Sequence, residues 1–261
     1  MKQFVTLLLA AVFAVGVAYG QIGFVYGKIN KPSRPSRQIA EPEMVRVEGG
    51  TFWMGCNEDS IDDCEEEEIP AHIVTVSSFS IGKYEVTQAL WKQVMGNNPS
   101  DWKGDNLPVE KVTWQDVQNF ISRLNVATGK KYRLPTEAEW EFAARGGNQT
   151  RGYKYSGSDT LDNVGWYYFN SGKTVPVGGK LPNELGIYDM SGNVWEWCSD
   201  WFGNYTYSEQ TDPIGASLGS AHVTRGGAWS IVDERRCTVG YRGEGGLNDK
   251  YNFTGFRLAL P

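Results

Sequence analysis

The chain has 261 residues, of which 40% are hydrophobic and 21% charged, with a formal net charge of −6. This composition is typical of a globular protein and excludes a disordered or fibrous chain. The acidic balance, without an extended cluster of Lys and Arg, argues against a nucleic-acid-binding surface. Only His72 and His222 are histidines, which excludes a metal site built from three of them. The 31 glycines and 10 tryptophans indicate long, ordered loops held by large side chains.

The first twenty residues have the pattern of a secretory signal peptide. Lys2 precedes an apolar run over residues 4–18, and small residues at 18 and 20 mark a cleavage site before Gln21. The run of about 15 residues is shorter than the roughly 20 that a membrane-spanning helix needs, so an anchor is the less favoured alternative. No later segment is apolar enough to span a membrane. We expect a signal peptide at 1–20, a linker at 21–43 and one domain at 44–261, exported to the periplasm or exterior of a bacterium.

The elements expected from periodicity are short. Alternating apolar residues predict strands at 44–47, 52–54, 72–76, 79–81 and 256–260. Helices are predicted over 87–95, from Thr113 and from Thr136, and the last has a capping box because Glu139 follows its N-cap residue by three positions. The acidic run at 65–68 is expected to be a solvated face. The short strands and few helices predict an α+β fold. Almost no periodicity remains between Gly146 and Arg225, so we expect a long loop there that is functional, held by metal, or both.

All four cysteines lie in the part expected to be exported, where thiols are commonly oxidised. Four cysteines allow three pairings. Cys56 and Cys64 are close enough to close one small loop, which leaves Cys198 and Cys237 as the second pair. The alternative is a zinc or copper site, which the spacing and the lack of a nearby histidine disfavour.

Six segments together have a distinctive sequence. In chain order they read GGTFWMG at 49–55, YEVT at 84–87, YRLPTEAEWE at 132–141, GIYDMSGNVWEW at 186–197, RGG at 225–227 and GFR at 255–257. Their combination and order resemble the formylglycine-generating enzyme (sulfatase-modifying factor) family. The resemblance spans about residues 44–261 and implies that family's fold, an elaborated C-type lectin fold.

The fourth segment carries a candidate calcium site. Asp189 and Glu196 bracket a glycine turn, and oxygen ligands of this kind suit a hard cation, calcium best of all. The resemblance implies two structural calcium ions, the first held by Asp189, Gly192, Val194 and Glu196 and the second near Asn163, Val164 and Asn170. The alternative is that Asp189 and Glu196 cap turns or pair with arginines.

The enzymes of this family hold copper with two cysteines shortly after an Arg-Gly-Gly motif and oxidise a substrate cysteine to formylglycine. Soft thiolates suit Cu(I), so the chemistry needs both sulfurs. Here Ile231 stands at the first cysteine's place, and Cys237 falls beyond the second. Copper is therefore not expected. A related branch that uses iron and histidines is excluded because the chain has too few histidines.

The sequence thus predicts a non-catalytic, exported binding or scaffold module, stabilised by calcium, with a protein, peptide or glycan ligand in the former active-site groove. The residues expected to line that groove are Trp229, Ser230, Asp233, Glu234, Arg235, Arg242 and Asn248. One alternative is an oxidoreductase that modifies a cysteine of sulfatases or of another exported protein. Another is a structural protein without a small ligand. Ile231 favours the binding module over the enzyme.

Overall fold

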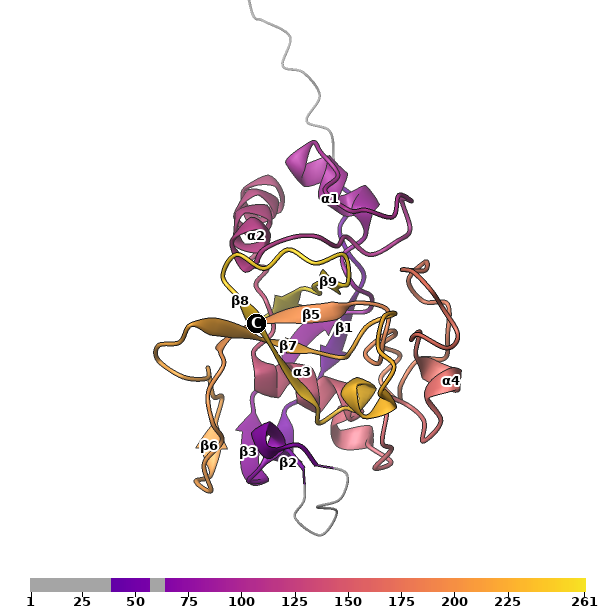
Figure 1. Ribbon diagram of the computed structural model, residues 1–261. Coiled ribbons are helices and arrows are strands. Elements are labelled where there is room, and N and C mark those ends of the chain that lie inside the picture. The colour runs from indigo at the N-terminus through magenta and orange to yellow at the C-terminus, as the bar shows by residue number, and fades with distance from the viewer. Residues whose placement is uncertain (1–38, 57–63) are drawn as a thin grey trace, which may run out of the picture. The chain divides into compact units, whose positions relative to one another are not determined.

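The computed structural model describes residues 39–56 and 64–261 (Figure 1). The expected signal peptide and most of the expected linker lie outside these residues. The last part of that linker already packs on the domain, because Ile39 contacts the hydrophobic cluster around α1 and α2 and the Ala40 N–H donates to Oε1 of Gln93 at 3.1 Å. No helix in the described part of the chain combines the length and apolar character needed to cross a membrane.

The strands of the described residues form three small sheets. One has the order β1-β4-β10, with strands Met44–Val47, Phe79–Gly82 and Ala259–Leu260. Another has the order β2-β3-β6, with strands Gly50–Met54, His72–Val76 and Gln210–Thr211. The largest has the order β8-β7-β5-β9, with strands Arg242–Gly246, Ala221–Arg225, Trp195–Trp201 and Thr254–Gly255. β8 is therefore an edge strand of the largest sheet.

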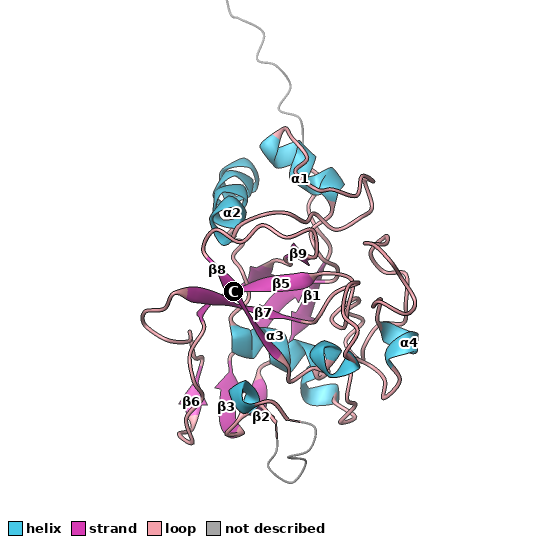
Figure 2. Cartoon of the chain, viewed as in Figure 1, coloured by secondary structure: helices cyan, strands magenta, loops and turns pink. Residues whose placement is uncertain are grey.

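The first three α-helices begin where the sequence predicts them, whereas α4 and the 3-10 turns were not predicted (Figure 2). They are α1 at Gln88–Met95, α2 at Trp114–Thr128, α3 at Glu137–Ala144 and α4 at Leu161–Val164, with 3-10 turns η2 at Glu66–Glu68, η3 at Gly147–Gln149 and η4 at Glu234–Cys237. Thr87, Thr113 and Thr136 are the N-caps of the first three, and each hydroxyl accepts a hydrogen bond from the first turn. The capping box of Thr136 and Glu139 is confirmed.

Helix α3 is the central element of the domain. All eight of its residues are buried, and it contacts strands of two sheets, β2 and β3 on one and β5 and β7 on the other (Figure 1). Trp140 and Phe142 of α3 belong to the hydrophobic cluster between these sheets. A second cluster lies around α1 and α2, where the Trp91 and Phe120 rings stack at 5.1 Å. The polar residues of α3 are therefore enclosed by the core.

The stretch from Gly146 to Arg225 is not the continuous long loop that we expected. This stretch contains β5 and β7, and nearly every residue of both strands is buried. Strands buried on both faces lack the alternation that identifies a strand in a sequence. The strand expected at 256–260 is also shorter, because the Phe256 and Leu258 carbonyls accept from Val86 and Gly82 in loop contacts before β10 begins.

The Cys56–Cys64 disulfide is confirmed, but the expected bond between Cys198 and Cys237 is wrong. Cys198 on β5 packs in the cluster around α3, whereas Cys237 packs with Tyr155 and other residues of a separate cluster. Both thiols are free and fully buried. Burial raises the pKa of Cys198 well above its usual value and that of Cys237 to about 12, so both remain protonated.

We expect thiol titration without reductant to find no reactive thiol in the native protein and two after denaturation. The thiol reagent cannot reach Cys198 and Cys237 in the folded protein because they are buried, and Cys56 and Cys64 have no free thiol because they form a disulfide. Cys237→Ser should reduce the denatured count from two to one. A count of zero in the denatured wild-type protein would instead establish the second disulfide.

Candidate functional site

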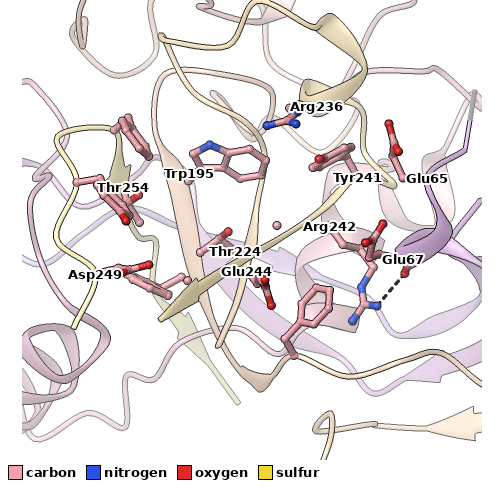
Figure 3. Close-up of a pocket in the computed structure, with 16 residues that line it drawn as sticks. Glu65, Glu67, Trp195, Thr224, Arg236, Tyr241, Arg242, Glu244, Asp249 and Thr254 are labelled. Atoms are coloured by element: carbon pink, nitrogen blue, oxygen red, sulfur yellow. Dashed lines mark hydrogen bonds between the residues drawn. The ribbon is translucent and has the colours of Figure 1, made fainter. Parts of the chain in front are cut away.

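A cavity of about 460 Å³ lies along β8 and is called the β8 cavity below (Figure 3). Its aromatic lining includes Trp195, Tyr241, Tyr251 and Phe253. Its carboxylates are Glu65, Glu67, Glu244 and Asp249. In Figure 3, Trp195 and Tyr241 lie on one side of the open space, with Thr224 and Glu244 on the other. Aromatic surface with a few charged groups is typical of a ligand site.

Glycines allow β8 to lie close to the indole rings beneath it. A Cβ added at Gly245 would lie 2.2 Å from Cη2 of Trp197, and one at Gly243 would lie 2.6 Å from Oγ1 of Thr224. A side chain at either position would therefore require β8 or the Trp197 and Thr224 side chains to move. The glycine-rich sequence of β8 fixes the floor of the cavity.

The charge of the cavity is unbalanced. Arg242 lines it but is buried, and its Nε and Nη2 donate to both carboxylate oxygens of Glu137 at 2.7 and 2.9 Å. Its guanidinium carbon also lies 3.8 Å from the ring centroid of Tyr205. Arg236 is the other arginine of the lining, which also has four carboxylates, and of these Glu65 lies 3.4 Å from Arg235 outside the lining. The cavity wall is therefore acidic.

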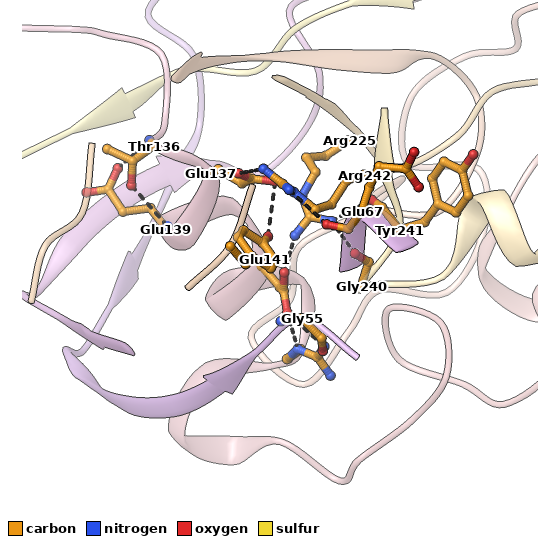
Figure 4. Close-up of polar contacts among 12 residues, drawn as sticks. Gly55, Glu67, Thr136, Glu137, Glu139, Glu141, Arg225, Gly240, Tyr241 and Arg242 are labelled. Carbon is orange, nitrogen blue, oxygen red and sulfur yellow. Dashed lines mark hydrogen bonds and ion pairs between the residues drawn. The ribbon is translucent and has the colours of Figure 1, made fainter. Parts of the chain in front are cut away.

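Arginines pair with the buried carboxylates of α3 next to the cavity (Figure 4). Arg225 donates through Nη2 to Glu141, and its Nε lies 3.4 Å from Oε1 of Glu137. Its Nη1 donates to the Gly240 carbonyl at 2.6 Å, which fixes the chain just before β8. The other oxygen of Glu141 accepts from Nε of Arg145 at 2.8 Å. The conspicuous charged residues of two sequence motifs thus build the frame of the cavity.

The acidic run at 65–68 is only partly the solvated face that we expected. Glu66 and Glu67 are exposed, but Glu68 is buried, and burial raises its pKa to about 7. Glu65 and Glu67 line the β8 cavity, so the run contributes to the candidate site. The sequence of this acidic run does not indicate that it lies beside β8, which is far away along the chain.

The residues expected to line the groove do not gather at this cavity. Of the seven, only Arg242 lines it; the others are Trp229, Ser230, Asp233, Glu234, Arg235 and Asn248. The Asp233 carboxylate caps η4 and pairs with Arg235, and the Trp229 indole donates to the Asn252 carbonyl at 3.1 Å. Glu234 and Asn248 are exposed, and Ser230 is half-buried. Six of these residues lie outside the lining of the β8 cavity because the chain turns through η4 before it forms β8.

Glu196 does not have the arrangement of a calcium ligand. Arg257 donates to both of its carboxylate oxygens at 2.6 Å, and the Trp140 indole donates to one of them at 2.7 Å. Both side chains of the Glu196–Arg257 pair are fully buried. The alternative that Glu196 pairs with an arginine is therefore confirmed, and the two-carboxylate calcium site does not fit these residues.

Asp189 differs from Glu196, because one of its oxygens has no partner. Oδ2 accepts from the Gly178 N–H at 2.6 Å, whereas the buried Oδ1 makes no hydrogen bond. Burial raises the pKa of Asp189 to about 6. Burial, and then the charge of Asp189, also raise the pKa of Glu85 well above its usual value. This corner of the domain therefore has excess negative charge that a proton or a cation would relieve.

The residues expected to bind the second calcium ion form hydrogen bonds within their own loop. The Asn170 amide donates to Asp162 and to the Gly165 carbonyl, and its oxygen accepts from Tyr167. The Asn163 amide donates to Ser158, and Val164 is buried. Within residues 39–56 and 64–261, no three His, Cys, Asp or Glu side chains are grouped to hold a metal ion.

Comparison with known proteins identifies the family. The profile of the sulfatase-modifying factor enzyme 1-like domain matches residues 30–261. The chain belongs to this family. The Chaperone protein LppX of Paenibacillus barcinonensis is 34% identical in an alignment 253 residues long, and the match covers 77% of this chain and 83% of that protein. The formylglycine-generating enzyme of Thermomonospora curvata is 30% identical and is matched over 87% of this chain and 96% of its own length.

A solved structure extends the similarity to the fold. Treponema denticola variable protein 1 matches with a TM-score of 0.76 and 33% identity, over 83% of this chain and 94% of that one. The α+β, elaborated C-type lectin fold of the sulfatase-modifying factor family is thus confirmed. Its characteristic motifs here supply the partners of buried ion pairs, Arg225 with Glu141 and Arg257 with Glu196.

We expect Arg257→Met to lower the free energy of unfolding by about 3–5 kcal/mol, because it leaves the Glu196 carboxylate buried without its partner. The measurement is urea unfolding at neutral pH. Arg46→Met is the matched control, since Arg46 pairs with Glu48 at 3.5 Å with both side chains mostly exposed, and it should change stability by less than about 1 kcal/mol. Equal effects of the two substitutions would contradict this assignment.

Proposed function

We propose that this chain is an exported, non-catalytic member of the sulfatase-modifying factor family whose β8 cavity binds a protein or peptide. Export is supported by the signal-peptide pattern and by the Cys56–Cys64 disulfide, which suits an oxidising compartment. Relatives in this family have names as different as chaperone and formylglycine-generating enzyme. Family membership therefore does not decide the activity, which has to be argued from the site.

The state of the four cysteines is the observation that carries the non-catalytic proposal. Two of them form a disulfide, and the other two are buried in separate clusters. Copper of the kind used by the family's oxidases needs accessible, deprotonated thiols close together. The pKa values of Cys198 and Cys237 are raised by burial, which opposes deprotonation. Ile231, half-buried against the cluster that contains Cys237, offers no ligand atom at the expected place.

The β8 cavity supports a binding role. Its volume of about 460 Å³ lies within the roughly 300–1,000 Å³ of ligand pockets. The buried ion pairs of α3 hold its walls, because Arg225 and Arg242 fix the chain on both sides of Tyr241. A peptide is favoured over a glycan by the backbone edge of β8, which lies along the cavity.

Incubation with a Cys-x-Pro-x-Arg peptide, copper and oxygen should leave the peptide cysteine unoxidised, because no accessible thiol pair is present. Mass spectrometry of the peptide is the measurement, with an active formylglycine-generating enzyme as the positive control. Formylglycine formed by this chain would establish the alternative, an oxidoreductase acting on exported proteins. Prior reduction of the disulfide in a parallel sample tests whether Cys56 and Cys64 could supply the chemistry.

Calcium is a further part of the proposal, restricted to the Asp189 side of the expected site. Its support is the unpartnered Oδ1 of Asp189 and the excess of carboxylates over Arg257 in that corner. Glu196 would not contribute while it is paired with Arg257. A bound calcium ion would neutralise the buried charge and stabilise the loop that contains Gly178.

In EDTA, Asp189→Asn should stabilise the protein at about pH 8 by about 2–3 kcal/mol, because it removes a buried charge. The pKa of Asp189 is higher in the folded than in the unfolded chain, so its contribution makes stability fall as pH rises from about 4 to about 6. The free energy of unfolding of the variant should lack the decrease between about pH 4 and about pH 6 that Asp189 causes. Asn tolerates the left-handed φ of 57° at this position and can still accept from Gly178. Urea unfolding across this pH range gives both values.

The same two proteins test the calcium proposal. Calcium should raise the melting temperature of the wild-type protein at about pH 8 and leave that of Asp189→Asn almost unchanged. An equal response of the two proteins, or none in either, would exclude calcium at Asp189.

A further inference from the structure

We propose that the β8 cavity binds an extended basic peptide, which adds as a strand to the free edge of β8. The inference rests on the proposed function and specifies its ligand. Three observations carry it: the open edge of the strand, the excess of carboxylates beside it, and the different character of its two faces. Strand addition of this kind uses backbone hydrogen bonds for affinity and side-chain pockets for specificity.

The hydrogen-bond register shows which backbone groups of β8 are open. The Phe202 N–H donates to the Ala221 carbonyl at 2.9 Å, so alternate residues of β7 beginning at Ala221 face β5. His222 and Thr224 therefore face β8, where they pair with Gly245 and Gly243. It follows that the N–H and C=O of Arg242 and Glu244 point away from β7.

The outer edge of β8 is closed at Gly246 and buried at Arg242, which leaves the exposed Glu244 between them. The Gly246 N–H donates to the Asp249 carboxylate at 2.9 Å, and the Gly246 carbonyl accepts from the Asp249 N–H. No strand of the described residues pairs with this edge, since β8 is last in the order of its sheet. The backbone of Glu244 is thus available, and exposed edges of this kind are sites for pairing with another chain.

The two faces of β8 call for different side chains in the added strand. Glu244 lies on the same face as Arg242, and the Arg242 guanidinium donates to the Glu67 carbonyl, which brings that residue to this face. Glu67 and Glu244 are both exposed there. On the opposite face, a Cβ at Gly243 would lie 3.1 Å from the Trp195 ring. A strand that alternates basic and apolar residues would therefore complement both faces.

Charge selects a basic peptide over an acidic one. Glu137 neutralises Arg242, and Arg235 lies 3.4 Å from Glu65, so within the lining Arg236 opposes the three remaining carboxylates, Glu67, Glu244 and Asp249. Arg236 itself lies over the Tyr241 ring at 5.8 Å, at one end of the cavity. A Lys or Arg side chain of the ligand would find carboxylates at Glu67 and Glu244.

Fluorescence anisotropy with labelled peptides of about nine residues tests this on the whole mature protein. One peptide alternates Lys and Val, and its counterpart has Glu in place of Lys. The basic peptide should bind at least about tenfold more tightly, and its affinity should fall as salt is raised from about 50 to about 300 mM. Equal binding of the two peptides would overturn the proposal.

Backbone methylation tests whether binding uses strand addition. Two further basic peptides carry N-methyl groups. One is methylated at the odd-numbered amides and the other at the even-numbered amides, because these two sets of N–H groups point to opposite edges of a strand. At least one of them should bind about tenfold more weakly, because its N–H groups can no longer donate to β8. If both bind as tightly as the unmethylated peptide, the edge of β8 is not the site.

A matched pair of variants locates the binding site. Glu244→Lys should weaken the basic peptide by about tenfold, whereas Glu48→Lys, an exposed residue outside the cavity lining, should change it by less than about twofold. Circular dichroism of both variants checks that the fold is intact. Equal effects of the two substitutions would show only a general response to charge and would overturn the assignment.

The outcomes separate this inference from the function on which it rests. If no peptide binds and the cysteine peptide also stays unoxidised, strand addition is excluded while the non-catalytic assignment stands. If formylglycine is formed, the non-catalytic assignment is excluded, whatever the anisotropy shows.

Discussion

The pairing of arginines with carboxylates in the core is the interaction on which the other features depend. A buried, unpaired carboxylate costs several kcal/mol, so each acidic residue of α3 requires a partner at a fixed place. Arg225 comes from the end of β7 and Arg242 from the start of β8, and both meet α3. The pairs thus bring together segments that lie about 100 residues apart, as the separation of 105 positions between Glu137 and Arg242 shows. Arg242 also donates to the Glu67 carbonyl, so the same side chain holds β8 beside η2 at the cavity.

The parts of the fold governed by local rules could be predicted from the sequence. Thr136 caps the helix that it was expected to cap, and Thr87 and Thr113 cap helices that were expected to begin there, because a hydroxyl at an N-cap acts within a few residues. The family could be predicted as well, since its motifs are long and occur in a fixed order. The alternative role for Glu196, an ion pair with an arginine, was visible in the same motifs, but only the three-dimensional contact with Arg257 decided between pair and metal.

The features that the sequence did not reveal depend on long-range contacts. β5 and β7 are buried on both faces, so no alternation identified them. Cys198 and Cys237 were paired by elimination, yet each belongs to a different hydrophobic cluster. The cavity lining draws on η2, β5, β8 and the segment after β8, so the residues that follow Arg225 directly gave a poor guide to it. In the sequence, only their charge distinguishes Glu67 and Glu244 as candidate residues of the cavity.

The close packing of β8 against indole rings has a consequence for how this surface could change during evolution. Gly243 and Gly245 have no room for a side chain, whereas Glu244 between them is exposed. Packing against the core therefore requires glycine at positions 243 and 245, whereas position 244 faces solvent and can accept other side chains. A new preference for ligand could arise by replacement at Glu244 alone, at little cost to folding. Stability and recognition are thus separately adjustable along five consecutive residues.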